Sequence, residues 1–348
     1  MKIRPSFFVA SIIILSTNLF AQKQSDTITI IGVGDFMPGS NYPTEQFLPI
    51  DSGKNIFDGI KNILTNADIT FGNLEGCLLN TGGTIKKCQD STKCYAFRIP
   101  IYFSGIIKNA GFNILNLANN HSGDFGNQGR LSTTRTLDSL GIYFAGSNSA
   151  PSVIFEKKGL KIGFCAFSPF IGTVDILKTD TIKRIIKTLD SLCDIVIVSM
   201  HAGAEGANFT NVTKQTEIFY GEDRGNVYEF AHLAIDCGAD IVFGHGPHVT
   251  RAIELYKDRL IAYSLGNFCT YKRFNLKGPN GIAPIIKVKT NCKGEFIQAQ
   301  IFSIKQIGEG IPVIDDTSAV LKQIIELTKN NFPETPLVID EYGNITKK

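Results

Sequence analysis

Residues 27–35 read TITIIGVGD, and this stretch indicates the class of fold. Residues 27–33 are mostly apolar or β-branched, which is typical of a buried strand, and Asp35 follows directly after Gly34. Similar short runs recur along the chain, and each predicts another buried strand: 68–73, 112–117, 161–167, 194–200 and 239–243. The chain therefore returns repeatedly to a buried strand that ends near a polar residue.

Helix-forming stretches lie between several of these strands, at residues 55–65, 100–110, 129–140, 181–191 and 224–237. Strands that alternate with helices of about ten or more residues are typical of βαβ units. We therefore expect a mostly parallel sheet with helices on its faces. The predicted fold class is α/β.

The pattern changes after residue 250, where strands follow one another without long helices, at 251–256, 259–263, 282–290 and 295–304. Charged or glycine-containing turns such as Lys293-Gly294 indicate antiparallel hairpins. We expect a second sheet against the first, with helices outside both. Residues 22–348 would then form one domain, with a core at about 28–305 and a C-terminal helix and polar tail at about 315–348.

The composition is that of an ordinary globular protein, with 43% hydrophobic and 19% charged residues among 348. The formal charge is +3, and Lys2 and Arg4 supply two of the positive charges, so the part after residue 21 carries 33 minus 32, or +1. So small a charge without runs of like charges argues against a nucleic-acid partner.

The first 21 residues have the pattern of a signal peptide. Lys2 and Arg4 precede an apolar stretch at 6–16, and Ala21 supplies a small residue for cleavage. We expect an exported protein, periplasmic or on the cell surface, that is soluble after cleavage. Because Leu19 is larger than the residue usual at its position before a cleavage site, an uncleaved N-terminal membrane tether is the alternative to cleavage. No later stretch is long enough to span a membrane.

The sequence has eight cysteines, and export would place them in an oxidising environment in which disulfides form. Cys88 and Cys94 lie in a polar insertion, residues 76–98, where a disulfide would close a short loop. The insertion could act as a lid or as a docking loop. Buried free thiols are expected at Cys165, Cys193, Cys237 and Cys269.

Acidic, amide and imidazole side chains gather immediately after the predicted strands. They are Asp35, Asn73, Glu75, Asn119, Asn120, His121, His201, Glu205, His245 and His248. The carboxyl ends of parallel strands meet at one edge of a sheet, where ligands bind. Such oxygen and imidazole donors suit Zn, Mn or Fe, so a site for one or two divalent metal ions is predicted. His232, inside a predicted helix, is expected to have no ligand role.

Six strings together resemble the CapA family of capsule and poly-γ-glutamate synthesis, within the calcineurin-like metallophosphoesterase superfamily. They are GDFMPG (34–39), NLEG (73–76), LANNHSGDFG (117–126), HAGAE (201–205), GHGPHV (244–249) and YSLGNF (263–268). They occur in family order, and the resemblance covers residues 28 to about 305. The resemblance implies a four-layer αββα sandwich, in which two mixed sheets lie between layers of helices.

The resemblance also implies roles for individual residues. Those expected to bind metal are Asp35, Glu75 as a bridging carboxylate, Asn120, His201, His245 and His248. His121 would contact substrate or donate a proton. Two departures leave the number of metals open: Met37 stands where the superfamily has a histidine, and His245 and His248 are three residues apart instead of two.

The implied chemistry is attack by a metal-activated water, with His121 as general acid. Asp124 and Glu205 would orient imidazoles, or would only cap turns, and Asn267 could face the same edge. An anionic envelope polymer or its precursor is the expected partner, together with a membrane synthesis or export complex. Two alternatives remain: a non-catalytic protein that grips polymer, and an α/β protein whose histidines are merely buried.

Overall fold

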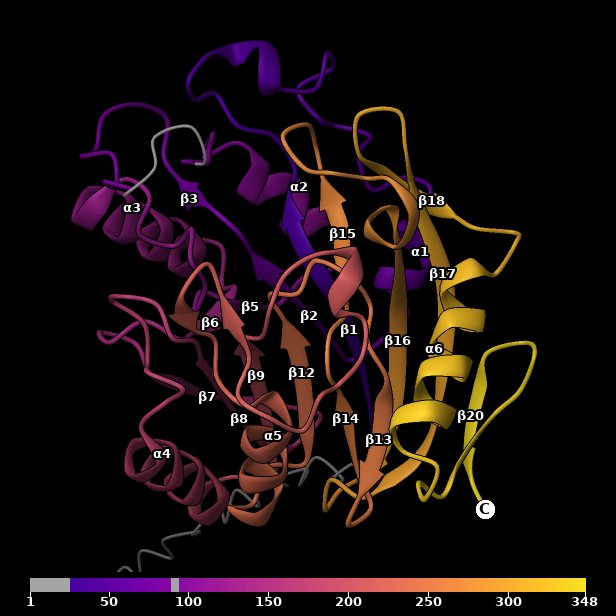
Figure 1. Cartoon of the computed structure of the whole chain (residues 1–348). Helices are drawn as coiled ribbons and strands as arrows, with labels where there is room; N and C mark the ends of the chain where they lie inside the picture. The colour runs from indigo at the N-terminus through magenta and orange to yellow at the C-terminus, as the bar shows by residue number, and fades with distance from the viewer. Residues whose placement is uncertain (1–25, 89–93) are drawn as a thin grey trace, which may run out of the picture.

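Two β-sheets pack face to face in the computed structural model, which describes residues 26–88 and 94–348 (Figure 1). The first sheet has the order β19-β20-β17-β16-β1-β2-β5-β6, with β15 beside β1 and β18 beside β17. Its strands are β1 (Thr27–Met37), β2 (Ile69–Leu74), β5 (Ile114–Asn116), β6 (Tyr143–Ala145), β15 (Asn267–Thr270), β16 (Ile282–Asn291), β17 (Phe296–Ile307), β18 (Ile311–Ile314), β19 (Leu337–Ile339) and β20 (Asn344–Lys347).

The second sheet has the order β13-β14-β12-β9-β8-β7. Its strands are β7 (Ser152–Lys157), β8 (Leu160–Phe167), β9 (Ile195–His201), β12 (Ile241–His245), β13 (Ile253–Tyr256) and β14 (Arg259–Ala262). The inner four strands are parallel, and the edge strands β7 and β13 are antiparallel to their neighbours. Two further pairs of short strands, β3 (Cys77–Leu78) with β4 (Arg98–Ile99) and β10 (Ile218–Phe219) with β11 (Glu222–Asp223), lie outside both sheets.

The two sheets divide the chain differently from the predicted division at residue 250, which was wrong. Each sheet contains its own set of parallel strands. They are β1, β2, β5 and β6 in the first sheet and β8, β9, β12 and β14 in the second. The antiparallel pair β16 and β17 does not start a new sheet, because β16 pairs along the edge of β1 from Thr27↔Asn291 to Gly32↔Ile286. Each sheet is therefore mixed.

Packing between the two sheets requires a glycine at position 32, within the stretch 27–35. Phe243 on β12 stacks on Phe71 of β2 in the facing sheet, with ring centroids 5.3 Å apart. A Cβ atom at Gly32 on β1 would overlap the ring of Phe243. Gly32 therefore lets the two sheets approach closely enough to bury these rings, and burial of such apolar surface is the main stabilising contribution.

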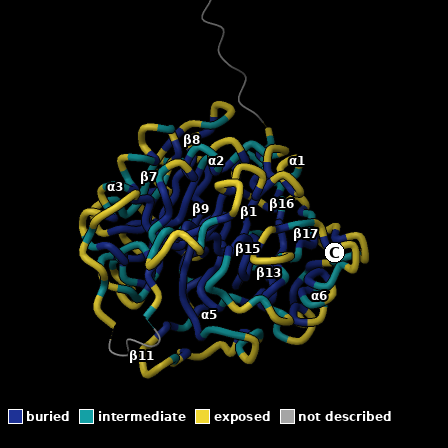
Figure 2. Tube along the Cα trace, turned by 90° about the horizontal axis from the view of Figure 1, so that it is seen from above, coloured by how far each residue is buried: buried dark blue, intermediate teal, exposed yellow. Residues whose placement is uncertain are grey.

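Helices cover the outer faces of both sheets, so the four-layer αββα arrangement is confirmed (Figures 1 and 2). On the first sheet lie α1 (Lys61–Leu64), α2 (Phe103–Asn109) and α3 (Gly126–Ser139), and on the second α4 (Thr179–Leu192) and α5 (Val227–Asp236). In α4 the buried residues Ile182, Ile185, Ile186 and Leu189 recur at the spacing of one helix face. The remaining helix, α6 (Ala319–Asn331), packs beside β16 and β17.

Two predicted elements at the ends of the domain differ from the structure. The helix predicted over 55–65 is α-helical only at Lys61–Leu64, because the preceding residues form successive turns. The predicted polar tail contains β19 and β20, which extend the first sheet and bury Ile345 completely. The signal-peptide prediction lies outside the described residues. Among the residues that are described, no helix is long and apolar enough to cross a membrane.

The predicted disulfide between Cys88 and Cys94 is confirmed. Cys165, Cys237 and Cys269 are buried free thiols as predicted, whereas Cys193 is only partly buried. Cys193 caps the C-terminal end of α4, where the chain turns toward β9 at the surface.

A buried ion pair fixes the long segment that follows β9. Arg251 is fully buried, and its Nη1 and Nη2 donate to Oε1 and Oε2 of Glu217, both at 2.8 Å. The same guanidinium donates to the carbonyl oxygens of Phe209 at 2.8 Å and Ala204 at 3.2 Å. Arg251 therefore ties three points of the segment after His201 to the start of β13.

We expect Arg251→Met to lower the free energy of unfolding by ~3 kcal/mol, because it leaves the Glu217 carboxylate buried without its partner. Urea denaturation measures the change. The double variant Arg251→Met/Glu217→Leu should recover part of the loss. Lys257→Met is the matched control, because its pair with Asp236 is exposed to solvent and should contribute little to stability. An Arg251→Met variant as stable as the Lys257→Met variant would contradict the assigned role.

Candidate functional site

The predicted site residues come from strand ends of both sheets that meet at the same end of the sandwich. Asp35 lies near the end of β1 and Glu75 follows β2, both in the first sheet. His201 and His245 are the last residues of β9 and β12 in the second sheet, where they are paired in register. The site therefore spans the junction between two sheets and not the edge of one.

Direct distances show that these side chains converge. His245 Nδ1 lies 3.0 Å from Asp35 Oδ1, and His248 Nδ1 lies 3.0 Å from Asp35 Oδ2. Glu75 Oε1 is 3.6 Å from His248 Nε2 and 4.0 Å from Nε2 of both His121 and His201. One potential ligand atom from each of Asp35, Glu75 and His248 falls within 4.8 Å of the others.

Many polar atoms in this cluster are buried without a hydrogen-bond partner. They are Asp35 Oδ2, Glu75 Oε1 and Oε2, Asn120 Oδ1, His201 Nε2, His245 Nε2 and His248 Nδ1. Buried polar atoms in folded proteins nearly always have a partner, because an unmet one is costly. Carboxylate, amide and imidazole donors gathered in this way fit a divalent metal ion.

The charges of the cluster support the same interpretation. Burial raises the pKa of Glu75, and repulsion from Asp35 adds to this effect. Burial alone would lower the pKa of His248, but Glu75 and Asp35 beside it raise the pKa above its ordinary value. Without a cation, protons must balance two carboxylates in a buried space, and a divalent ion would replace them.

His121 is held next to this cluster by Asp124. Asp124 Oδ2 lies 2.7 Å from His121 Nδ1 and accepts a 2.7 Å hydrogen bond from the backbone N–H of Phe97. The ring of Phe97 packs on the imidazole at 4.3 Å between centroids. Asp124 thus orients an imidazole, and His121 presents Nε2 to the site.

Lys86 is a contributor that sequence analysis missed. Its Nζ lies 2.6 Å from Asp124 Oδ1 and donates to the carbonyl oxygen of Asn120 at 3.2 Å. Its backbone N–H donates to the carbonyl oxygen of Asp124 at 2.8 Å. In sequence, Lys86 precedes the Cys88–Cys94 disulfide and Phe97 follows it. The polar insertion therefore contacts the loop that carries His121 both before and after the disulfide. A lysine in a polar insertion gives no local sequence signal for such a contact.

Two buried asparagines from the motif strings link the ligands to this loop. Asn73 Nδ2 donates to Asp35 Oδ1 at 2.8 Å and lies 3.2 Å from His201 Nδ1. Asn119 Nδ2 donates to Asn73 Oδ1 at 2.9 Å, and Asn119 Oδ1 accepts from the backbone N–H of His121 at 3.0 Å. Both were noted in the sequence without a role.

Four other residues singled out in the sequence have contacts outside the cluster. Glu205 pairs with Arg224 at 2.7 Å and not with a histidine, contrary to the expected orienting role. Asn267 donates to the carbonyl oxygen of Asn280 at 3.1 Å. Met37 is fully buried in the apolar cluster of the outer layer, so it offers the site nothing. His232 lies on α5, and its Nε2 is 2.9 Å from Oε2 of Glu254 on β13.

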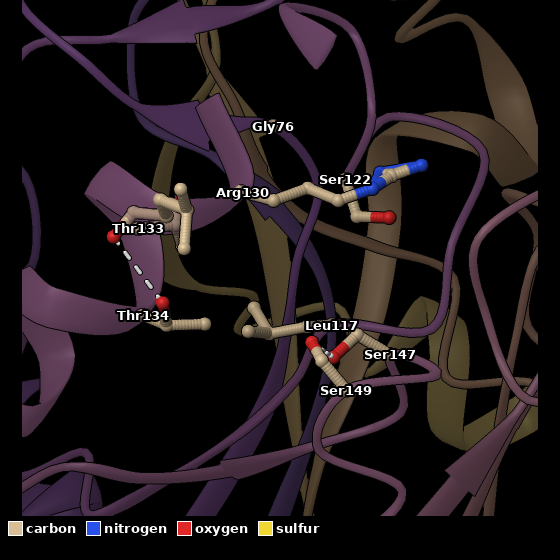
Figure 3. A pocket seen from close by; sticks show the side chains of 9 residues that line it. Gly76, Leu117, Ser122, Arg130, Thr133, Thr134, Ser147 and Ser149 are labelled. Carbon is tan, nitrogen blue, oxygen red and sulfur yellow. Dashed lines mark hydrogen bonds between the residues drawn. The ribbon is translucent and has the colours of Figure 1, made fainter. Parts of the chain in front are cut away.

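The lining of one pocket includes Gly76 and Ser122, which directly follow Glu75 and His121 in sequence (Figure 3). Arg130 from α3 extends past Ser122 and donates to the carbonyl oxygen of Ile171 at 3.0 Å. A Cβ atom at Gly123 would overlap the guanidinium of Arg130. Arg130 therefore joins the loop of His121 to the loop that follows β8.

Residues 29–272 match the sequence model of the bacterial capsule synthesis protein family PGA_cap. The chain belongs to this family. It is similar to the capsule biosynthesis protein CapA of Bacillus anthracis, with 26% identity over 266 residues that cover 71% of this chain and 60% of that protein. It is also similar to the PGA biosynthesis protein CapA of Bacillus subtilis strain 168, with 29% identity over 259 residues, 70% of this chain and 63% of that protein.

The chain thus spans about three-fifths of the length of these PGA_cap relatives. Among solved structures, a purple acid phosphatase from yellow lupin seeds is similar at 11% sequence identity, with a TM-score of 0.39. That similarity covers 86% of this chain and 55% of the phosphatase.

We expect Mn²⁺ or Zn²⁺ added to EDTA-treated protein to raise the melting temperature by about 5 °C at 100 times the dissociation constant, because the ion binds only the folded site. Differential scanning fluorimetry measures the shift. Asp35→Asn and His248→Gln should lose it. His232→Gln, which removes a histidine outside the cluster, should keep it, and loss of the shift there would argue against a localised site.

Proposed function

We propose that this protein is a divalent-metal-dependent hydrolase or transferase that acts on an anionic polymer of the cell envelope or on its precursor. The observation that carries the proposal is the group of unpartnered buried atoms of Asp35, Glu75 and His248, beside an imidazole that Asp124 orients. Membership of the PGA_cap family supports capsule or poly-γ-glutamate synthesis as the setting.

Asp35, Glu75 and His248 would hold the metal ion, and further donor atoms come from Asn120 and His245. When bound, an ion such as Mn²⁺, Zn²⁺ or Fe²⁺ supplies Lewis acidity, lowering the pKa of a water toward ~7 and offsetting transition-state charge. Because the Nδ1 of His121 faces Asp124, Nε2 is the atom that gives or takes a proton at the site. Lys86 balances the buried charge of Asp124 and so keeps this pair in place.

Export is part of the proposal, because envelope polymers are assembled or attached outside the cytoplasm. The N-terminal pattern of residues 1–21 supports it, with release by cleavage or retention by an uncleaved tether. A membrane synthesis or export complex would then be the natural partner.

A second candidate is a non-catalytic protein that grips polymer on the same scaffold. Met37 favours it, because a residue whose side chain packs in the outer apolar cluster cannot complete a metal site. The two candidates differ in whether substrate is turned over, since either could bind polymer.

We expect the metal-loaded protein to hydrolyse p-nitrophenyl phosphate or bis(p-nitrophenyl) phosphate, or to shorten poly-γ-glutamate. His121→Ala should lower kcat by ~10²–10⁴-fold, because it removes the proton-transfer group. Asp35→Ala should abolish turnover, and His232→Gln should not alter it. Polymer binding by metal-loaded protein without turnover of any of these substrates would instead support the accessory role.

A further inference from the structure

The two oxygens of Asp35 have different surroundings. Oδ2 lies 3.0 Å from His248 Nδ1 but makes no hydrogen bond. The carboxylate oxygens of Glu75, which also have no hydrogen-bond partner, lie on the same side. Oδ1 has two partners: Asn73 Nδ2, which donates at 2.8 Å, and His245 Nδ1 at 3.0 Å. One side of Asp35 is therefore unsatisfied and the other is already hydrogen-bonded.

The amide of Asn73 is fixed in this orientation. Asn73 is fully buried, and its Oδ1 accepts a 2.9 Å hydrogen bond from Asn119 Nδ2, which also donates to the carbonyl oxygen of Leu74 at 2.9 Å. Rotation of the amide by 180° would set its oxygen against the Asp35 carboxylate and its NH₂ against another NH₂. Its donor group must therefore face Asp35.

The same NH₂ group lies 3.2 Å from His201 Nδ1. An imidazole nitrogen that accepts a hydrogen bond carries no proton, so neutral His201 has its proton on Nε2. Nε2 then carries the proton and lies 4.0 Å from Glu75 Oε1, without a hydrogen bond. His201 is left without a free lone pair to offer a metal ion.

We infer that the centre binds a single divalent cation, on the side of Asp35 Oδ2, Glu75 and His248. The amide of Asn73 occupies the place between Asp35 and His201 that a second cation would need. This inference rests on the proposed metal dependence and adds the number of ions. A neutral NH₂ satisfies both acceptors without further ligands, whereas a carboxylate at position 73 would add a second buried negative charge next to Asp35 and require a cation to balance it.

The test is the number of Mn²⁺ ions bound per chain, measured by equilibrium dialysis with elemental analysis, together with the EPR spectrum. Wild-type protein should bind one ion and give the spectrum of isolated Mn²⁺. Asn73→Asp, which has nearly the same shape, should bind two and show the spectrum of a spin-coupled pair. Asn226→Asp is the matched control, because it makes the same exchange at the N-cap of α5, outside the site, and should still bind one.

Ligand substitutions test the inference even where Asn73→Asp fails to fold. His201→Gln should retain one Mn²⁺ per chain with a dissociation constant within about tenfold of wild type, whereas His248→Gln should lose it. Two ions in the wild type, loss of Mn²⁺ from His201→Gln, or a folded Asn73→Asp that still binds one would each overturn the inference. No bound Mn²⁺ in the wild type would instead refute the proposed metal dependence.

Discussion

The buried carboxylate of Asp35 is the group on which the arrangement of the site depends. It is fully excluded from solvent, and a charge in such a place requires partners. Those partners come from both sheets: Asn73 from the adjacent strand, and His245 and His248 from the end of β12. Burial would raise the pKa of Asp35, but the hydrogen bond with His245 and the proximity of His248 hold it well below its usual value. The partners of Asp35 are therefore complete only when the two sheets are packed together.

Asp124 is a second buried carboxylate, and it holds together the loop of His121 and the polar insertion. Its partners are His121, the backbone of Phe97 and the ammonium group of Lys86. The polar insertion is thereby attached to the loop of His121 and Asp124 at two points, one on either side of a disulfide. The described parts of the insertion, at Lys86 and Phe97, therefore belong to the site, which favours neither a freely moving lid nor a docking loop separate from it.

The sequence allowed prediction of what depends on local pattern. Six strands, β1, β2, β5, β8, β9 and β12, and the polar residues at their ends were recognisable because alternation of apolar strands and helices is local information. The division between the sheets was not predictable, because β16 joins β1 through pairing between residues more than 250 positions apart. Lys86, Asn73 and Glu205 have roles set by partners far along the chain, and no spacing within their own segments records those partners.

Gly34 and Gly244, from two of the motif strings, have a common physical cause that only the structure shows. The segment at residues 263–267 leaves β14 in the second sheet and enters β15 in the first, so it passes between the ends of β1 and β12. A Cβ atom at Gly34 would overlap the carbonyl of Gly266, and one at Gly244 would overlap the carbonyl of Tyr263. These close approaches allow Asp35 N–H to donate to Gly266 at 2.8 Å and Leu265 N–H to donate to Gly244 at 3.0 Å. The crossing segment thus fixes the backbone directly beside Asp35 and His245, and any side chain at Gly34 or Gly244 would push these two site residues apart.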